Sequence, residues 1–147
     1  MIAPKKSLGQ NFLIDNKIID KITNLVDIKN ETVFEVGPGT GNLTEFIIKQ
    51  NPKKVIVIEK DANLVEKLKK KFKKKIIIIN DDILKVNEYS LFNEKVIVYG
   101  NLPYNISTEI LSKWIINLKK NFWFYNLILM FQKEVADRII AEVNTKN

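Results

Sequence analysis

The sequence contains no cysteine and no histidine, and Arg138 is the one arginine among its 147 residues. The absence of cysteine excludes disulfide bonds and thiolate chemistry, which favours a reducing compartment and a cytoplasmic location. Because histidine is also absent, neither a metal site nor histidine-based catalysis is expected. No apolar run reaches the length of a membrane span, and the first residues lack the apolar stretch of a signal peptide. We therefore expect no association with a membrane.

The composition is typical of a single globular domain, with 46% apolar and 28% charged residues. The net charge of +7 indicates an anionic partner, and nucleic acid is the first candidate. Apart from Arg138, every cation is a lysine. A chain so rich in lysine, isoleucine and asparagine can owe its charge to a biased genome composition, so the charge is weak support for that partner.

The most informative stretch is VIVYGNLPYNIST, residues 96–108. Its apolar start predicts a buried strand that ends at Gly100. Pro103 lacks a backbone N–H and disfavours helix at Leu102, so the chain must turn there. Ligands of open parallel sheets bind at the carboxyl ends of the strands, and this turn follows such an end.

The side chains of this turn suit an exocyclic amine on a nucleic-acid base. Asn101 Oδ1 and the carbonyl of Leu102 could accept its two N–H groups and leave its lone pair free for attack. Tyr104 could stack on a base that has left its helix. The same residues could equally form an ordinary turn in which Asn101 satisfies its own backbone. The motif by itself leaves both interpretations open.

A glycine-rich turn, GPGTG at residues 37–41, lies between a predicted strand and a predicted helix. This order lets a ligand approach bare backbone at a helix N-terminus, so Gly37 and Gly39 are candidate cofactor-binding residues. The spacing differs from the dinucleotide fingerprint G-x-G-x-x-G, which disfavours a nicotinamide dehydrogenase. Glu59 closes the next strand, 22 positions after Gly37. A carboxylate at that offset commonly accepts the ribose hydroxyls, although strand ends also carry surface glutamates.

Strand and helix patterns alternate five times along the chain. Strands are expected at residues 32–37, 55–59, 76–80, 96–100 and 124–131, and helices at 15–26, 42–49, 62–72, 107–118 and 132–143, with a loop at 86–94. Ser107 or Thr108 should cap the fourth helix. This order predicts a doubly wound, mainly parallel α/β sheet with a switch point beside the first strand. Gly37, Glu59 and the polar residues that end the third and fourth strands should then lie along one edge.

Three motifs carry a family resemblance: LGQNFL at residues 8–13, NLPYNIST at 101–108 and LMFQKEVADRIIA at 129–141. Asn-Leu-Pro-Tyr after a strand is the signature of amino-group methyltransferases that use S-adenosylmethionine. The three motifs together resemble the ribosomal RNA adenine dimethyltransferases. The resemblance implies a Rossmann-like fold with S-adenosylmethionine as cofactor. It also implies double methylation of adenine N6 in small-subunit ribosomal RNA, in support of ribosome biogenesis.

The resemblance also implies roles for individual residues. Asn11 and Leu13 match positions that pack on the cofactor, and Asp82 matches the residue that accepts the N6–H of the cofactor's adenine. Asp81, beside it, is expected to be a loop or capping residue. The catalytic motif that the resemblance implies consists of Asn101, Leu102, Pro103 and Tyr104, and the cofactor-binding set consists of Asn11, Leu13, Gly37, Gly39, Glu59, Asp82 and Asn101.

Lys5 and Lys6 are candidate contacts to RNA phosphates, whereas the lysine run at 69–75 is expected to be a solvated helix end. Members of the resembled family continue through two further strands and a small helical domain that grips ribosomal RNA. We therefore expect residues 1–147 to be a catalytic domain truncated after the fifth strand–helix unit, with an exposed sheet edge. The expected partner is ribosomal RNA or a precursor of the small subunit, bound by a monomer.

Two alternatives remain open at this point. One is a large-subunit ribosomal RNA adenine methylase of the macrolide-resistance type, which shares the Gln-Asn-Phe and Asn-Leu-Pro-Tyr motifs. The glycine loop and the sequence FQKEVADR favour the small-subunit enzyme. The other is a non-catalytic RNA-binding assembly factor that has kept the fold, against which the intact motif at residues 101–104 argues.

Overall fold

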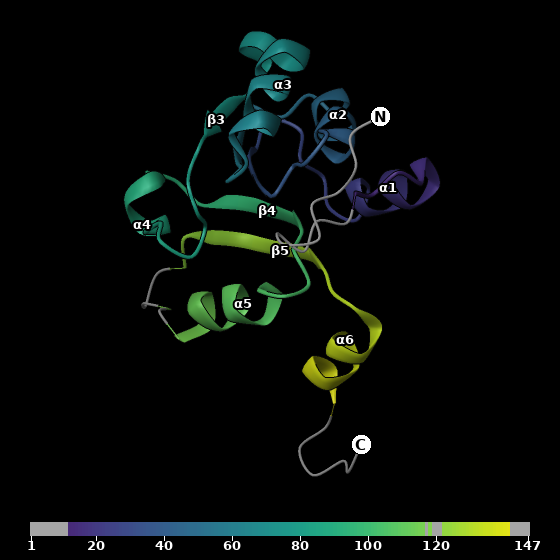
Figure 1. The fold of residues 1–147 in the computed structure, drawn as a ribbon, viewed down its shortest axis with the longest axis vertical. Helices are drawn as coiled ribbons and strands as arrows, with labels where there is room; N and C mark the ends of the chain where they lie inside the picture. The colour runs from purple at the N-terminus through teal and green to yellow at the C-terminus, as the bar shows by residue number, and fades with distance from the viewer. Residues whose placement is uncertain (1–11, 117, 119–121, 142–147) are drawn as a thin grey trace.

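The computed structural model describes residues 12–116, 118 and 122–141. Five parallel strands form one sheet in the order β3-β2-β1-β4-β5 (Figure 1). The strands are β1 (Thr32–Val36), β2 (Lys54–Ile58), β3 (Ile77–Ile79), β4 (Val96–Asn101) and β5 (Phe124–Met130). The predicted doubly wound parallel α/β sheet is thus confirmed, and the chain changes direction across the sheet at β1, between β2 and β4.

Helices cover both faces of this sheet (Figure 1). They are α1 (Asn16–Thr23), α2 (Asn42–Lys49), α3 (Ala62–Phe72), α4 (Glu88–Leu91), α5 (Ser107–Ile116) and α6 (Lys133–Ile140), with a short 3-10 helix η2 (Lys73–Lys75) after α3. Apolar residues of α1, α2 and α3 pack in one core layer, and those of α4 and α5 in the other. All five residues of β1 are buried, as expected for a central parallel strand that is covered on both faces.

Local side-chain chemistry sets the helix ends. Asp15 caps α1 by accepting from the backbone N–H of Lys17 and Ile18. The helix ends at Thr23, three residues before its predicted end. There the Thr23 hydroxyl donates to the Ile19 carbonyl at 3.0 Å and the Asn24 amide donates to the Asp20 carbonyl at 2.8 Å. These polar side chains satisfy the last carbonyls and stop the helix.

The segment predicted as a loop at residues 86–94 contains α4. Asn87 caps it through the Tyr89 backbone N–H, at 3.2 Å. The predicted cap of α5 is wrong, because the helix begins at Ser107 itself. The Ile106 carbonyl accepts the Ile110 N–H at 2.9 Å, whereas the Ser107 hydroxyl donates to the Tyr104 carbonyl.

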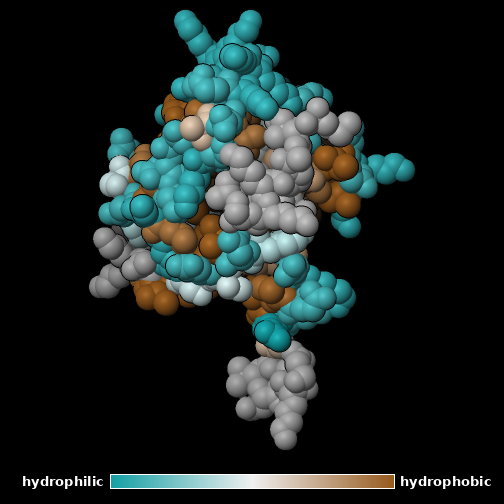
Figure 2. Space-filling view, in the orientation of Figure 1, coloured by the Kyte–Doolittle hydropathy of each residue, from teal (hydrophilic) through white to brown (hydrophobic). Residues whose placement is uncertain are grey.

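The surface differs between the two ends of the sheet. Hydrophilic surface gathers over α3, the helix that carries the lysine run (Figure 2). At the other side, β5 pairs with β4 alone within the described residues and so forms a sheet edge, where Tyr125 is 62% exposed. In the described part of the chain, no helix is long and apolar enough to cross a membrane.

Candidate active site

One cavity of about 170 Å³ opens at the carboxyl ends of the strands. A single buried water needs only about 10–15 Å³, so this space fits an organic ligand. The residues that line it come from the ends of four strands and from the segment before α1. They are Phe12, Val36, Gly37, Gly39, Ile58, Glu59, Lys60, Asp81, Asp82, Ile83, Leu84, Asn101, Pro103, Asn105 and Ile106. The sheet therefore brings the predicted residues Gly37, Glu59, Asp82 and Asn101 to one cavity.

The glycine turn lines this cavity with bare backbone. Its backbone conformation is one that residues with side chains disfavour. Gly37 and Gly39 have φ angles of +67° and +58°. The Gly37 N–H donates to the Ile58 carbonyl at 3.0 Å, which fixes the turn to the end of β2. A Cβ on Gly39 would lie 2.9 Å from Phe12 Cδ1. A side chain at Gly39 would thus clash with Phe12, which also lines the cavity.

Glu59 presents a buried carboxylate at the end of β2. Its Oε2 accepts the Gly39 N–H at 3.2 Å and its Oε1 accepts the Asp61 N–H at 2.9 Å. Burial raises the pKa of Glu59, and the two backbone hydrogen bonds oppose that rise. Each carboxylate oxygen keeps a lone pair beyond these bonds, so Glu59 can accept two further hydroxyl donors.

Asp82 lies in the loop after β3 and faces the same cavity. Its Oδ1 accepts the Leu84 N–H at 3.0 Å, and its Oδ2 pairs with Lys60 Nζ at 2.8 Å. The hydrogen bond from Lys60 holds the pKa of Asp82 below its usual value. Asp82 is therefore a carboxylate acceptor at neutral pH. Asp81, predicted as a loop residue, accepts the Asp82 N–H at 2.7 Å and also lines the cavity.

The Asn-Leu-Pro-Tyr turn supplies the remaining wall. Asn101 is the last residue of β4, and it lines the cavity together with Pro103. Leu102, between them, is buried in the core, 1% exposed, and does not line the cavity. Tyr104 is 38% exposed and does not line the cavity. It therefore faces solvent, where an incoming base could reach it.

A second, smaller cavity of about 20 Å³ adjoins the glycine turn and contains Leu13. Asn101 lines both cavities. The Asn42 side-chain amide donates to the Leu13 carbonyl at 2.8 Å and so holds the segment before α1 against α2. The predicted contacts of Asn11, Lys5 and Lys6 lie outside the described residues.

Glu35 is a site residue that sequence reasoning missed. It sits in the middle of β1, is 1% exposed, and lines the smaller cavity. Its Oε2 accepts the Thr44 hydroxyl at 2.6 Å. Burial raises the pKa of Glu35 from 4.5 to about 7. An acidic residue inside an apolar strand, two positions before the glycine turn, was the signal that could have revealed it.

The chemistry of this donor set can be tested against the predicted cofactor. The cavity wall is largely apolar, and most of its polar side chains are acceptors: the carboxylates of Glu59, Asp81 and Asp82 and the amide oxygen of Asn101. Carboxylates repel phosphate, so a dinucleotide fits poorly. A ligand with hydroxyl groups, an exocyclic amine and positive charge fits well. S-adenosylmethionine has all three features.

Comparison with known proteins agrees with this assignment. Over residues 2–147 the chain matches the family described as ribosomal RNA adenine dimethylase. It is 61% identical over 146 residues to the ribosomal RNA small subunit methyltransferase A of Pelagibacter ubique (strain HTCC1062), covering 99% of this chain and 56% of that protein. The chain spans about half the length of the curated relatives it matches.

Solved structures show the same fold. A dimethyladenosine transferase from Plasmodium falciparum superposes with a TM-score of 0.76 at 33% identity, covering 90% of this chain and 47% of that one. The 23S rRNA methyltransferase ErmE superposes with a TM-score of 0.73 at 27% identity, covering 86% of this chain and 50% of that one.

Proposed function

The chain belongs to the ribosomal RNA adenine dimethylase family, and from this premise we propose that it transfers methyl groups from S-adenosylmethionine to N6 of adenines in small-subunit ribosomal RNA. The observation that carries the proposal is that Gly37, Glu59, Asp82 and Asn101, from the ends of four strands, line one cavity. The 61% identity to a small subunit methyltransferase supports the choice of RNA.

Three groups hold the cofactor in this proposal. Glu59 accepts the two ribose hydroxyls with the lone pairs that Gly39 and Asp61 leave free. Asp82 accepts the N6–H of the cofactor's adenine. The glycine turn gives the amino-acid end room against bare backbone. Leu13 and Asn11 pack on the cofactor from the N-terminal side.

The target base meets the turn at the end of β4. Asn101 Oδ1 and the Leu102 carbonyl accept the two N–H groups of the target amine, and its lone pair then points along the line of attack. Tyr104, exposed at the turn after Pro103, stacks on the extruded base. When bound, S-adenosylmethionine supplies a methyl group already activated by its sulfonium. Catalysis by this chain therefore rests on positioning, and the proton of the amine leaves to water.

The remaining assignments follow from the same premise. Residues 1–147 form an S-adenosylmethionine-binding catalytic domain, and the chain spans about half the length of the curated relatives that it matches. The partner is ribosomal RNA or a small-subunit precursor. The protein acts as a monomer in the cytoplasm, a location that the lack of cysteine supports.

Calorimetric titration of the chain with S-adenosylmethionine, with NAD in parallel, tests the cofactor. Binding of the first ligand alone is expected, and binding of NAD instead would overturn the proposal. Transfer of labelled methyl groups is then measured on small-subunit and large-subunit ribosomal RNA. Label in adenine of the small-subunit RNA is the expected result.

A second candidate is methylation of large-subunit RNA, favoured by the structural similarity to ErmE, a 23S rRNA methyltransferase. Label confined to large-subunit RNA would establish it. Binding of both the cofactor and RNA without transfer would instead identify a non-catalytic assembly factor.

A further inference from the structure

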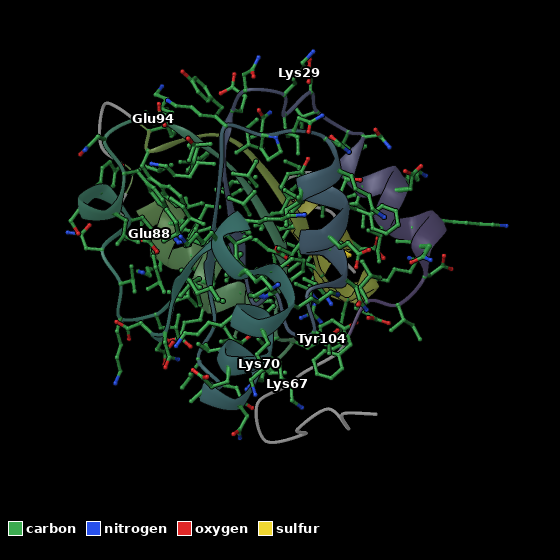
Figure 3. The ribbon with its side chains drawn as sticks, turned by 90° about the horizontal axis from the view of Figure 1, so that it is seen from above. Lys29, Lys67, Lys70, Glu88, Glu94 and Tyr104 are labelled. Carbon is green, nitrogen blue, oxygen red and sulfur yellow. The ribbon has the colours of Figure 1, made fainter. Side chains whose placement is uncertain are left out.

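A partly buried ion pair lies beside the loop between β3 and α4. Lys113 of α5 pairs with Glu88 of α4, with Nζ 2.7 Å from Oε1, and the two side chains are 20% and 6% exposed. The Trp114 indole N–H donates to the same Glu88 oxygen at 2.7 Å. Figure 3 labels Glu88, whose side chain extends toward α5. Two consecutive residues of α5 thus hold one carboxylate.

The Lys113 ammonium has a second set of acceptors. It donates to the carbonyl of Ile83 at 2.7 Å and to the carbonyl of Val86. Both carbonyls belong to the loop between β3 and α4. Hydrogen bonds from a charged donor are worth more than those from a neutral one, especially in a partly buried place. This loop is therefore fixed to α5 by a cation rather than by apolar contact alone.

The fixed loop is the one that carries Asp82. Ile83 and Leu84 line the main cavity beside it, and the Leu84 N–H donates to Asp82 Oδ1 at 3.0 Å. The opposite end of the connection is α5, which starts three residues after Tyr104 in the turn proposed to hold the target base. Lys113 thus joins the loop at one end of the cavity to the helix that follows the other end.

We propose that Lys113 is a positioning residue that holds Asp82 where it reads the adenine N6 amine of the cofactor. The inference rests on the proposed function, because it needs an adenosyl ligand in the main cavity. Without the lysine, the Ile83 and Val86 carbonyls lose a charged donor, and the loop can move away from the ligand. Glu88 has a different part in this arrangement. It neutralises Lys113 and accepts from the Trp114 indole N–H.

The test compares two ligands that differ only at the group Asp82 is proposed to read. S-adenosylhomocysteine carries the N6 amine, and its 6-deamino analogue carries a hydrogen there, so it offers the carboxylate no N–H donor. The wild-type chain is expected to prefer the adenosyl ligand by about tenfold or more, since a site built for a donor rejects an analogue without it. Asp82→Ala should abolish the preference, and its ratio of affinities is the value expected when the carboxylate makes no contribution.

Lys113→Met is expected to reduce the preference at least fivefold, because Asp82 is no longer held in place. Glu88→Gln is the matched control. Its amide oxygen can still accept from Trp114 and Lys113, so the preference should stay within twofold of wild type. Since Lys113→Met leaves the Glu88 carboxylate buried without its cation, the charge-neutral double variant Glu88→Gln/Lys113→Met is measured as well. It should also lose the preference, because both loop carbonyls lack the lysine donor.

The outcomes separate the two levels of inference. A wild-type chain that binds neither ligand would overturn the proposed function and this inference with it. A wild-type chain that prefers the adenosyl ligand, with the same preference in the double variant, would overturn the positioning role alone. If the lysine variants bind both ligands more weakly by the same factor, the positioning role is overturned as well. A purely structural contact would change both affinities and leave the preference unchanged.

Discussion

The backbone N–H of Gly39 donates to Glu59 Oε2 at 3.2 Å, and this bond joins the glycine turn after β1 to the carboxylate that ends β2. Two features that the sequence separates by twenty positions therefore act as one structural unit. The other Glu59 oxygen, Oε1, accepts the Asp61 N–H at 2.9 Å. The two bonds together fix the orientation of the carboxylate at the cavity. The residual lone pairs are left for a ligand.

Replacement of Glu59 should weaken cofactor binding strongly. Glu59→Ala removes both proposed ribose acceptors, each worth about 1–2 kcal/mol, so the affinity for S-adenosylmethionine should fall about 30-fold or more. Glu59→Gln should also weaken binding, because its NH₂ group would face a backbone N–H donor. Calorimetric titration measures both. Glu66→Ala, which removes an exposed glutamate from α3, is the matched control and should bind as wild type. Unchanged affinity in Glu59→Ala would restrict Glu59 to packing the glycine turn.

Replacement of Asn101 should separate chemistry from binding. Asn101→Ala removes one of the two acceptors proposed for the target amine, so methyl transfer should fall about 100-fold or more. The affinity for S-adenosylmethionine should change less than about threefold, because Glu59 and Asp82 remain. Labelled methyl transfer and calorimetry give the two values. Asn126→Ala, at an exposed position of the neighbouring strand β5, is the control and should retain transfer. Equal loss of transfer and affinity would contradict this division of roles.

Patterns along the chain predicted most of the fold. Runs rich in apolar residues predicted the strands, and the helices α2 and α3 lie within their predicted bounds. The polar residues at the strand ends predicted the cavity, because parallel strands place their carboxyl ends at one edge. Glu59 and Asn101 were found in this way, and both line the cavity.

What the patterns did not reveal depends on contacts between distant residues. Lys113 resembles any exposed lysine on an amphipathic helix, yet its partner Glu88 lies 25 positions earlier. Glu35 looks like an interruption of an apolar strand until Thr44 is seen to donate to it. Neither pairing follows a helical or strand period, so only the packing of α2 and α5 on the sheet creates it. The short helix α4 was missed for a different reason, because four residues are too few to show a helical period.

An alanine at Gly39 should destabilise the chain and close the cavity. The φ of +58° costs an L-residue about 1–2 kcal/mol, and the new Cβ would lie 2.9 Å from Phe12 Cδ1. The melting temperature should fall by several degrees, and S-adenosylmethionine should bind at least tenfold more weakly. Thermal unfolding with and without ligand measures both effects. Thr40→Ala, at the next position of the turn, is the matched control and should change either value little. A melting temperature for Gly39→Ala equal to that of wild type would contradict the strain argument.

The stability of the chain should depend on pH through Glu35. Burial raises the pKa of this carboxyl from 4.5 to about 7, so the folded state binds its proton more tightly than the unfolded state. The stability due to this group is therefore fully present below pH 4.5 and is lost as pH rises to about 7. The loss amounts to at most about 3 kcal/mol. Urea unfolding between pH 5 and pH 8 measures it.

Two variants identify Glu35 as the source of this dependence. Glu35→Gln cannot titrate but can still accept from Thr44, so the free energy of unfolding should vary less between pH 5 and pH 7.5 and should rise at pH 8. Thr44→Val removes the hydrogen bond that lowers the pKa of Glu35. Its loss of stability should therefore extend to higher pH than in wild type. Because burial also raises the pKa of Glu59, part of the slope will persist in Glu35→Gln. An unchanged slope in that variant would show that Glu59, and not Glu35, titrates in this range.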